Sequence, residues 1–126
     1  MDALLAAIPD ADHQEVGGAQ IDIVRAGSVR VGRVVYPPGF RWSSHMKSIV
    51  GGESCGHAHV GFLARGQVQG TYADGCSFKF VAPAVVVLEP GHDAWVVGGE
   101  PAVLIQFDAE ADTVRRFGLA GEHRHS

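Results

Sequence analysis

The sequence predicts an all-β domain, either a sandwich or a closed barrel, and three observations lead to this fold class. Apolar residues alternate with polar ones at period two from Ile21 onward, as in half-buried strands. Turn residues recur at the spacing of short antiparallel strands, and the 17 glycines fall between the apolar runs. Helical patterning is confined to short stretches near the two ends. Together these features predict many short strands and little helix.

The expected elements follow one another in order. Residues 1–20 are predicted to form an N-terminal arm, residues 21–110 the barrel, and residues 111–126 a short helix and tail. Within the arm, residues 4–8 form either one helical turn or a docking segment that stops at Pro9. Residues 40–56 are predicted to be a strand followed by a long loop. The other expected strands are 21–25, 29–35, 59–64, 67–73, 76–81, 84–88, 95–97 and 102–107, with Asp74-Gly75 as the clearest hairpin turn.

Composition excludes several classes of protein. A chain of 126 residues fits one domain. The net charge is −4 and the sequence contains no cluster of basic residues, so we expect no nucleic-acid partner. No apolar run is long enough to span a membrane, and the first residues lack the basic segment of a secretory signal. The two cysteines, Cys55 and Cys76, are therefore expected to be reduced, in a cytoplasmic protein.

Two blocks of the sequence resemble the motifs of the cupin superfamily. The first cupin motif reads G-x5-H-x-H-x3–4-E-x6-G, and here five residues separate Gly39 from His45, while six separate His59 from Gly66. The second motif, built around P-x-G-x2-H, is similar to residues 83–92. The stretch 90–98, Pro-Gly-His-Asp-Ala-Trp-Val-Val-Gly, is typical of one cupin subfamily. The resemblance implies a double-stranded β-helix, which is the cupin form of the jelly-roll barrel.

The chain also departs from the cupin pattern. Lys47 stands where cupins have a second histidine, and His59 stands where they have glutamate. In the strict second motif the histidine falls at Ala94, whereas His92 comes two residues earlier. A shift of two residues keeps a side chain on the same face of a strand, so His92 is still expected to point inward. A second register, with His57 and His59 as the H-x-H pair, also fits the first motif.

The resemblance implies one divalent metal ion held by His45, His59 and His92. Three histidines leave coordination positions open for water or a ligand. Glu53, Cys55 and His57 are further candidate ligands from the same loop. The identity of the metal stays open among Zn, Fe, Ni, Cu and Mn.

Three more residues are candidates for the surroundings of the metal. Asp93 either orients His92 or caps its own backbone, and Trp42 and Trp95 either line the pocket or complete the core. A site without the usual glutamate is more cationic, and it should favour an anionic or oxygen-donor ligand.

The sequence therefore predicts a metal-binding cupin that binds a small oxygenated molecule, and it leaves catalysis open. One alternative is a metal-dependent enzyme of the dioxygenase, isomerase or decarboxylase type. Nothing singles out a general acid or base among Tyr36, Lys47 and Tyr72. The other alternative is a metal-free module for ligand sensing or dimerisation. A homodimer paired through sheet edges is expected in each case.

Overall fold

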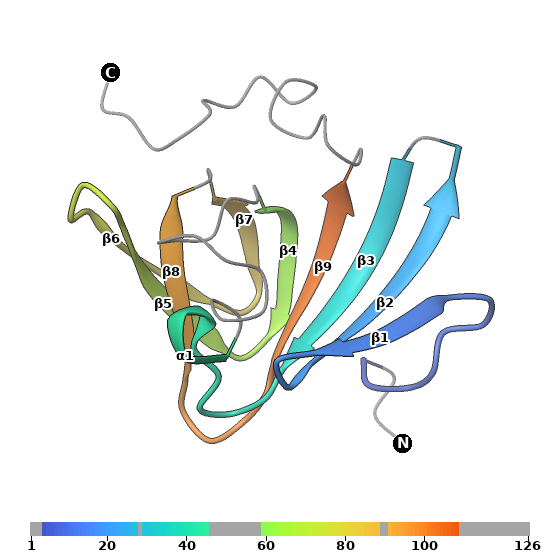
Figure 1. The fold of residues 1–126 in the computed structure, drawn as a ribbon, viewed down its shortest axis with the longest axis horizontal. Coiled ribbons are helices and arrows are strands. Elements are labelled where there is room, and N and C mark those ends of the chain that lie inside the picture. Colours follow the sequence, from blue (N-terminus) through green and yellow to red (C-terminus); the bar gives the residue numbers. More distant parts are fainter. Residues whose placement is uncertain (1–3, 28, 46–58, 89–90, 109–126) are drawn as a thin grey trace.

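Two antiparallel sheets form the molecule in the computed structural model, which describes residues 4–27, 29–45, 59–88 and 91–108 (Figure 1). The larger sheet has the strand order β1-β2-β3-β9-β4-β7, and the smaller one has the order β6-β5-β8. Within the described residues the elements are β1 (Asp12–Val16), β2 (Ala19–Ala26), β3 (Val29–Tyr36), α1 (Trp42–His45), β4 (His59–Arg65), β5 (Gln67–Tyr72), β6 (Ser77–Val81), β7 (Ala84–Leu88), β8 (His92–Val97) and β9 (Ala102–Asp108). The predicted all-β barrel is thus confirmed.

The core lies between the two sheets and is built by period-two alternation. In β7, the inward Val86 and Leu88 are buried, whereas the outward Val85 and Val87 are exposed. Leu63 of β4 lies opposite Leu104 of β9, and Leu104 in turn lies opposite Val34 of β3. The buried cluster consists of Ala19, Val34, Phe40, Trp42, Leu63, Tyr72, Val86, Leu88, Val96, Ala102 and Leu104.

The hairpin between β5 and β6 turns at Asp74-Gly75, as predicted. Gly75 has a φ of 92°, a conformation that residues with a side chain rarely adopt. The Asp74 carboxylate accepts a hydrogen bond from the backbone N–H of Cys76 at 2.9 Å, which closes the turn. The resulting register places Gly70 of β5 opposite Phe78 of β6.

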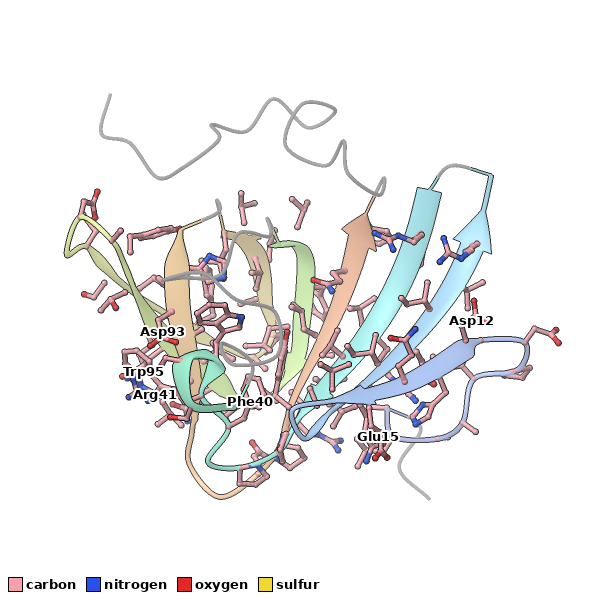
Figure 2. The ribbon with its side chains drawn as sticks, in the orientation of Figure 1. Asp12, Glu15, Phe40, Arg41, Asp93 and Trp95 are labelled. Carbon is pink, nitrogen blue, oxygen red and sulfur yellow. The ribbon has the colours of Figure 1, made fainter. Side chains whose placement is uncertain are left out.

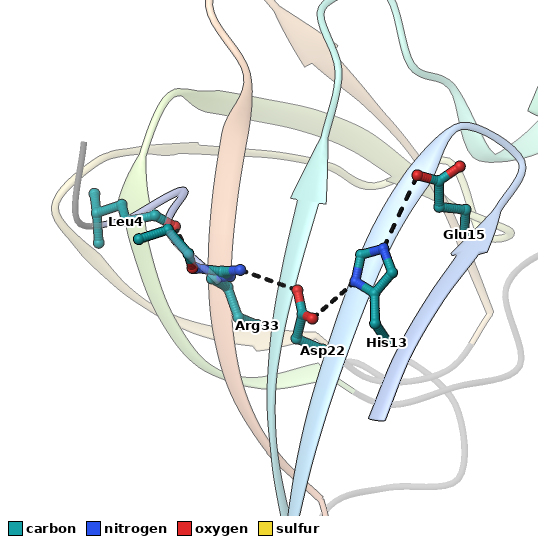
Figure 3. Close-up of polar contacts among 6 residues, drawn as sticks. Leu4, His13, Glu15, Asp22 and Arg33 are labelled. Atoms are coloured by element: carbon teal, nitrogen blue, oxygen red, sulfur yellow. Dashed lines mark hydrogen bonds and ion pairs between the residues drawn. The ribbon is translucent and has the colours of Figure 1, made fainter. Parts of the chain in front are cut away.

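The N-terminal segment contributes a strand of its own as well as an arm. β1 lies within the segment expected to be only an arm, and it pairs with β2 along its whole length. Four of its five residues are exposed, so a hydrophobic pattern did not reveal it. The residues before β1 fold back onto β3, where the guanidinium of Arg33 donates to the carbonyl oxygens of Leu4 and Ala6 at 2.9 and 2.6 Å (Figure 3). Of the two alternatives, the docking segment is the one observed.

The segment after Gly39 differs from the predicted strand. Phe40 accepts a hydrogen bond from the N–H of Val96 at 2.9 Å, and Arg41 forms a single β-bridge with Trp95. The chain then enters the short helix α1 instead of extending the ladder. Phe40 and Trp42 are both buried, and they reach the core from the segment just after the turn at Gly39 and from the first residue of α1.

Candidate functional site

The topology brings the backbones of two of the three predicted histidine ligands, His59 and His92, to one end of the barrel. His59 opens β4 and pairs with Leu88, the last residue of β7. His92 opens β8 only four residues after Leu88 and pairs with Tyr72 of β5. His45 ends α1, which packs against β8. His59 and His92, far apart in sequence, therefore share one end of the fold, and the helix that ends at His45 contacts the strand that begins with His92.

His92 lies inside the barrel and is almost completely buried, with 2% of its surface exposed. Its imidazole contacts two aromatic rings of the small sheet edge-on. The ring centroids of Tyr72 and Phe78 lie 6.3 and 6.1 Å away, at interplanar angles of 84° and 87°. A histidine held by perpendicular aromatic rings has its orientation restricted by packing.

A glycine on the neighbouring strand makes this packing possible. Gly70 of β5 faces the same side as Tyr72, and a Cβ atom at this position would collide with the ring of Phe78 and with the backbone oxygen of Asp93. Because Gly70 carries no side chain, the Phe78 ring can lie across the strand and reach His92.

The two-residue offset in the second motif leaves His92 on the inward face of β8. His92 and Val96 are both buried, and they share that face with Ala94 because side chains alternate along a strand. Ala94, at the position where the strict motif has histidine, lies opposite Gly70. Alanine therefore stands at the position where the strict motif has histidine. The imidazole of His92 points into the barrel two residues earlier, at the start of β8.

Asp93 and Trp95 lie on the other face of β8. The Oδ1 atom of Asp93 accepts hydrogen bonds from the backbone N–H groups of Ser43 at 3.0 Å and of Ala94 at 2.9 Å. The Oδ2 atom lies 3.4 Å from the guanidinium of Arg41. These bonds attach α1 to the start of β8, so Asp93 positions the helix that ends at His45.

The two tryptophans have different environments. Trp42 is buried in the core cluster between the sheets. Trp95 is partly exposed on the outer face, where the Arg41 guanidinium stacks 4.2 Å from its ring centroid. Figure 2 shows Arg41, Asp93 and Trp95 gathered beside β8, away from the interior. The sequence did not predict a role for Arg41, because its partners Asp93 and Trp95 lie more than 50 residues further along the chain and no local pattern connects them.

A shallow hollow of about 310 Å³ also lies on the small sheet. Its polar lining comes from outward positions of β5 and β6, with Trp95 of β8 beside them. His92 does not line the hollow, but Phe78 belongs both to the lining of the hollow and to the aromatic contacts of His92. The lining residues are Gln69, Gly70, Thr71, Ser77, Phe78, Lys79 and Trp95.

Several predicted ligands lie outside the described residues. Glu53, Cys55 and His57 belong to that part of the chain, while His45 and His59 are described by their backbones only. Among the side chains that the structure does describe, no group of three or more His, Cys, Asp and Glu residues is suited to a metal ion. The metal site therefore stays a prediction.

The second cysteine, Cys76, follows the β5–β6 turn. Partial desolvation first, and then the hydrogen bond and negative charge of Asp74, raise the pKa of its thiol. A protonated thiol is a poor nucleophile and a poor metal ligand, so Cys76 has no evident role in the site.

A buried polar network on the outer face of the large sheet was not foreseen from the sequence. Asp22 of β2 accepts hydrogen bonds from His13 of β1 at 2.8 Å and from Arg33 of β3 at 3.0 Å (Figure 3). Burial alone would raise the pKa of the Asp22 carboxyl, but the hydrogen bonds and positive charges of His13 and Arg33 outweigh it and hold that pKa below its usual value. The network joins three strands and the arm, which gives it a structural role.

Comparison with solved structures identifies the fold. A cupin 2 conserved barrel domain protein from Salinispora arenicola CNS-205 is similar with a TM-score of 0.58 and 17% identity, over 90% of this chain and 94% of that one. The chain has the cupin fold. The cupin domain of Cnp3 from Schizosaccharomyces pombe is also similar, with a TM-score of 0.56 and 14% identity, over 90% of this chain and 80% of that one.

An enzyme has the same fold. The oxalate decarboxylase of Lactobacillus farciminis, in a formate complex, is similar with a TM-score of 0.53 and 15% identity, over 89% of this chain and 40% of that one. No protein-family model matches the sequence, and no curated protein matches it. The described residues include no helix long and apolar enough to cross a membrane. At these identities the similarity shows the fold alone.

Proposed function

We propose that this cupin-fold protein binds one divalent metal ion in its barrel, through His45, His59 and His92, and presents it to a small oxygenated molecule. The observation that carries the proposal is the position of His92: its imidazole is buried inside the barrel, at the end where β4 begins with His59. An interior imidazole suits Zn, Cu, Fe and Ni.

The surroundings of His92 support a ligand role over a purely apolar core role. The rings of Tyr72 and Phe78 restrict the orientation of the imidazole, and Asp93, the nearest acidic residue in sequence, is bonded to α1 on the other face. Asp93 would then act on the site indirectly, by holding the helix whose last residue is His45.

Metal analysis of untagged protein tests the proposal. Wild-type protein purified without added metal should contain close to one metal ion per chain. His92→Ala and His59→Ala should each lose most of it, because removing one of three ligands weakens binding by orders of magnitude. The matched control is His13→Ala, a partly exposed histidine of β1, which should retain the metal. Wild-type protein without metal, or equal retention by all variants, would refute the site.

The enzyme alternative has one observation in its favour, namely that the fold is shared with an oxalate decarboxylase. A bound metal would supply Lewis acidity or oxygen activation. Oxygen uptake by Fe(II)-loaded protein with small diketones, phenols and thiols distinguishes this alternative. Turnover that disappears in His92→Ala supports an enzyme, whereas tight binding of an oxygenated ligand without turnover supports a binding protein.

A further inference from the structure

The outer face of the large sheet carries a continuous hydrophobic surface, which we name the apolar face. Most large hydrophobic side chains that are exposed in the described residues lie on it, the exceptions being Leu5 and Val81. Val85 of β7 is 75% exposed, the largest exposed fraction among these side chains. The apolar face consists of Val24, Val31, Val60, Phe62, Val85, Val87, Ile105 and Phe107, from the five adjacent strands β2, β3, β9, β4 and β7.

Strand register shows that these residues form two adjacent rows across the sheet. In the first row, Val24 lies opposite Val31, and Val31 opposite Phe107; Val60 and Val87 continue it across β4 and β7. In the second row, Ile105 lies opposite Phe62, and Phe62 opposite Val85. Cross-strand neighbours of this kind lie close enough to form one surface.

The apolar face carries no exposed charge among the described residues of its two rows. The charged residues in the second row, Asp22 and Arg33, are buried and pair with each other. The N-terminal arm covers Arg33 through its bonds to Leu4 and Ala6, whereas Val24, Val31, Phe62, Val85, Val87 and Phe107 stay exposed. The arm thus marks one border of the surface.

Its size is close to that of a small protein interface. The six exposed side chains present on the order of 500 Å² of apolar surface, at the upper end of what a monomer shows. Two such faces in contact would bury on the order of 1,000 Å², the size at which specific interfaces begin.

We propose that the apolar face binds the apolar face of a second copy of this chain. A charged partner would find no exposed charge to pair with on the apolar face, whereas a second apolar face is also uncharged and matches it. The chain has a net charge of −4, so two copies repel each other least where the surface is uncharged. Sheets also pack face to face through aliphatic side chains, and a two-fold axis through such a face gives a closed dimer.

Sedimentation velocity of the untagged protein from 1 to 200 µM tests the proposal. Wild type should sediment as a dimer at the upper concentrations and should stay dimeric when the salt concentration is raised. Val85→Lys should weaken association at least tenfold, because it places an ammonium group in each half of the contact. Val81→Lys is the matched control, since Val81 is an exposed valine of β6 in the other sheet, and it should associate as wild type does.

Val87→Lys provides a second variant if Val85→Lys fails to fold as judged by circular dichroism. A wild type that is monomeric at every concentration overturns the proposal, and so does a dimer that Val85→Lys and Val87→Lys leave unchanged. The latter result would place the interface elsewhere, for example at a sheet edge.

Discussion

Two Arg–Asp pairs in this protein each attach a short segment of the chain to a sheet, but one pair is buried and the other is partly exposed. Arg33 and Asp22 attach the N-terminal arm to the large sheet, at 3.0 Å and with 8% of each side chain exposed. Arg41 and Asp93 attach α1 to the small sheet, at 3.4 Å and with 43% and 22% of the side chains exposed. Water screens the second pair far more than the first, so the geometry of a pair does not by itself give its energy.

The backbone bonds around each pair sharpen this contrast. Arg33 donates to two carbonyl oxygens of the arm, whereas Asp93 accepts from the N–H groups of Ser43 and Ala94. In the buried pair the arginine is the residue that holds the attached segment, and in the exposed pair it is the aspartate. Removal of the carboxylate should therefore have different consequences at the two sites: at the buried pair it leaves the Arg33 guanidinium without its counter-ion, and at the exposed pair it leaves the N–H of Ser43 without its acceptor.

The largest effect is expected from Asp22→Ala, which leaves the Arg33 guanidinium buried without its counter-ion. We expect a loss of about 3 kcal/mol in the free energy of unfolding, measured by urea denaturation. Asp12→Ala is the control, because Asp12 lies 3.8 Å from Arg25 in an exposed pair and should cost less than about 1 kcal/mol. Equal losses from the two variants would remove the distinction between buried and exposed pairs.

A smaller effect of the same carboxylate should be visible in the pH dependence of stability. The folded pKa of Asp22 lies below its unfolded value. Its contribution is therefore fully present above the unfolded pKa of about 3.9 and is lost as the pH falls through the folded pKa. Asp22→Asn should flatten this part of the profile, as measured by thermal unfolding between pH 2 and 6. An Asn variant with the wild-type slope would show that other carboxylates cause the acid sensitivity.

Asp93→Ala should have an intermediate effect, because it removes three accepted hydrogen bonds at a partly exposed site. We expect a loss of about 1–2 kcal/mol and faster hydrogen exchange at the Ser43 amide. If the proposed metal site is correct, metal affinity should also fall, since α1 positions His45. Unchanged exchange at Ser43 would mean that α1 is held by Phe40 and Trp42 alone.

Arg41→Ala should have the smallest effect, about 0.5–1 kcal/mol, from the exposed ion pair and the stacking on Trp95. Trp95 fluorescence should change, because the guanidinium no longer covers the ring. Lys79→Ala, another cation on the same outer face, is the control and should leave the fluorescence nearly unchanged. A loss as large as that of Asp93→Ala would show that the ion pair, and not the backbone bonds, attaches α1.

Local pattern was sufficient for those parts of the fold that depend on near neighbours. The strand 84–88 was predicted with its observed bounds, because a dense β-branched run lies between two turns. The inward position of His92 followed from the two-residue period of a strand. β1 was not predicted, because four of its five residues are exposed and its sequence therefore shows no alternation of apolar and polar residues.

Contacts between distant residues could not be read in the same way. Nothing near Asp22 indicates that Arg33 lies opposite it, since that requires the register of β2 and β3. The stacking of Arg41 on Trp95 depends on a bend after Gly39 that replaces a predicted strand. The histidine set was proposed from motif spacing, and of its three side chains His92 is the one that the structure describes.

The glycine at position 70 has a consequence for how this barrel could be redesigned. Its missing side chain leaves the space that the Phe78 ring occupies beside His92. The width of the interior at His92 therefore depends on Gly70 of the neighbouring strand β5, which has no side chain to contact the imidazole. Changing the size of the molecule that can approach His92 would start with the pair formed by Gly70 and Phe78, and the histidine could stay unaltered.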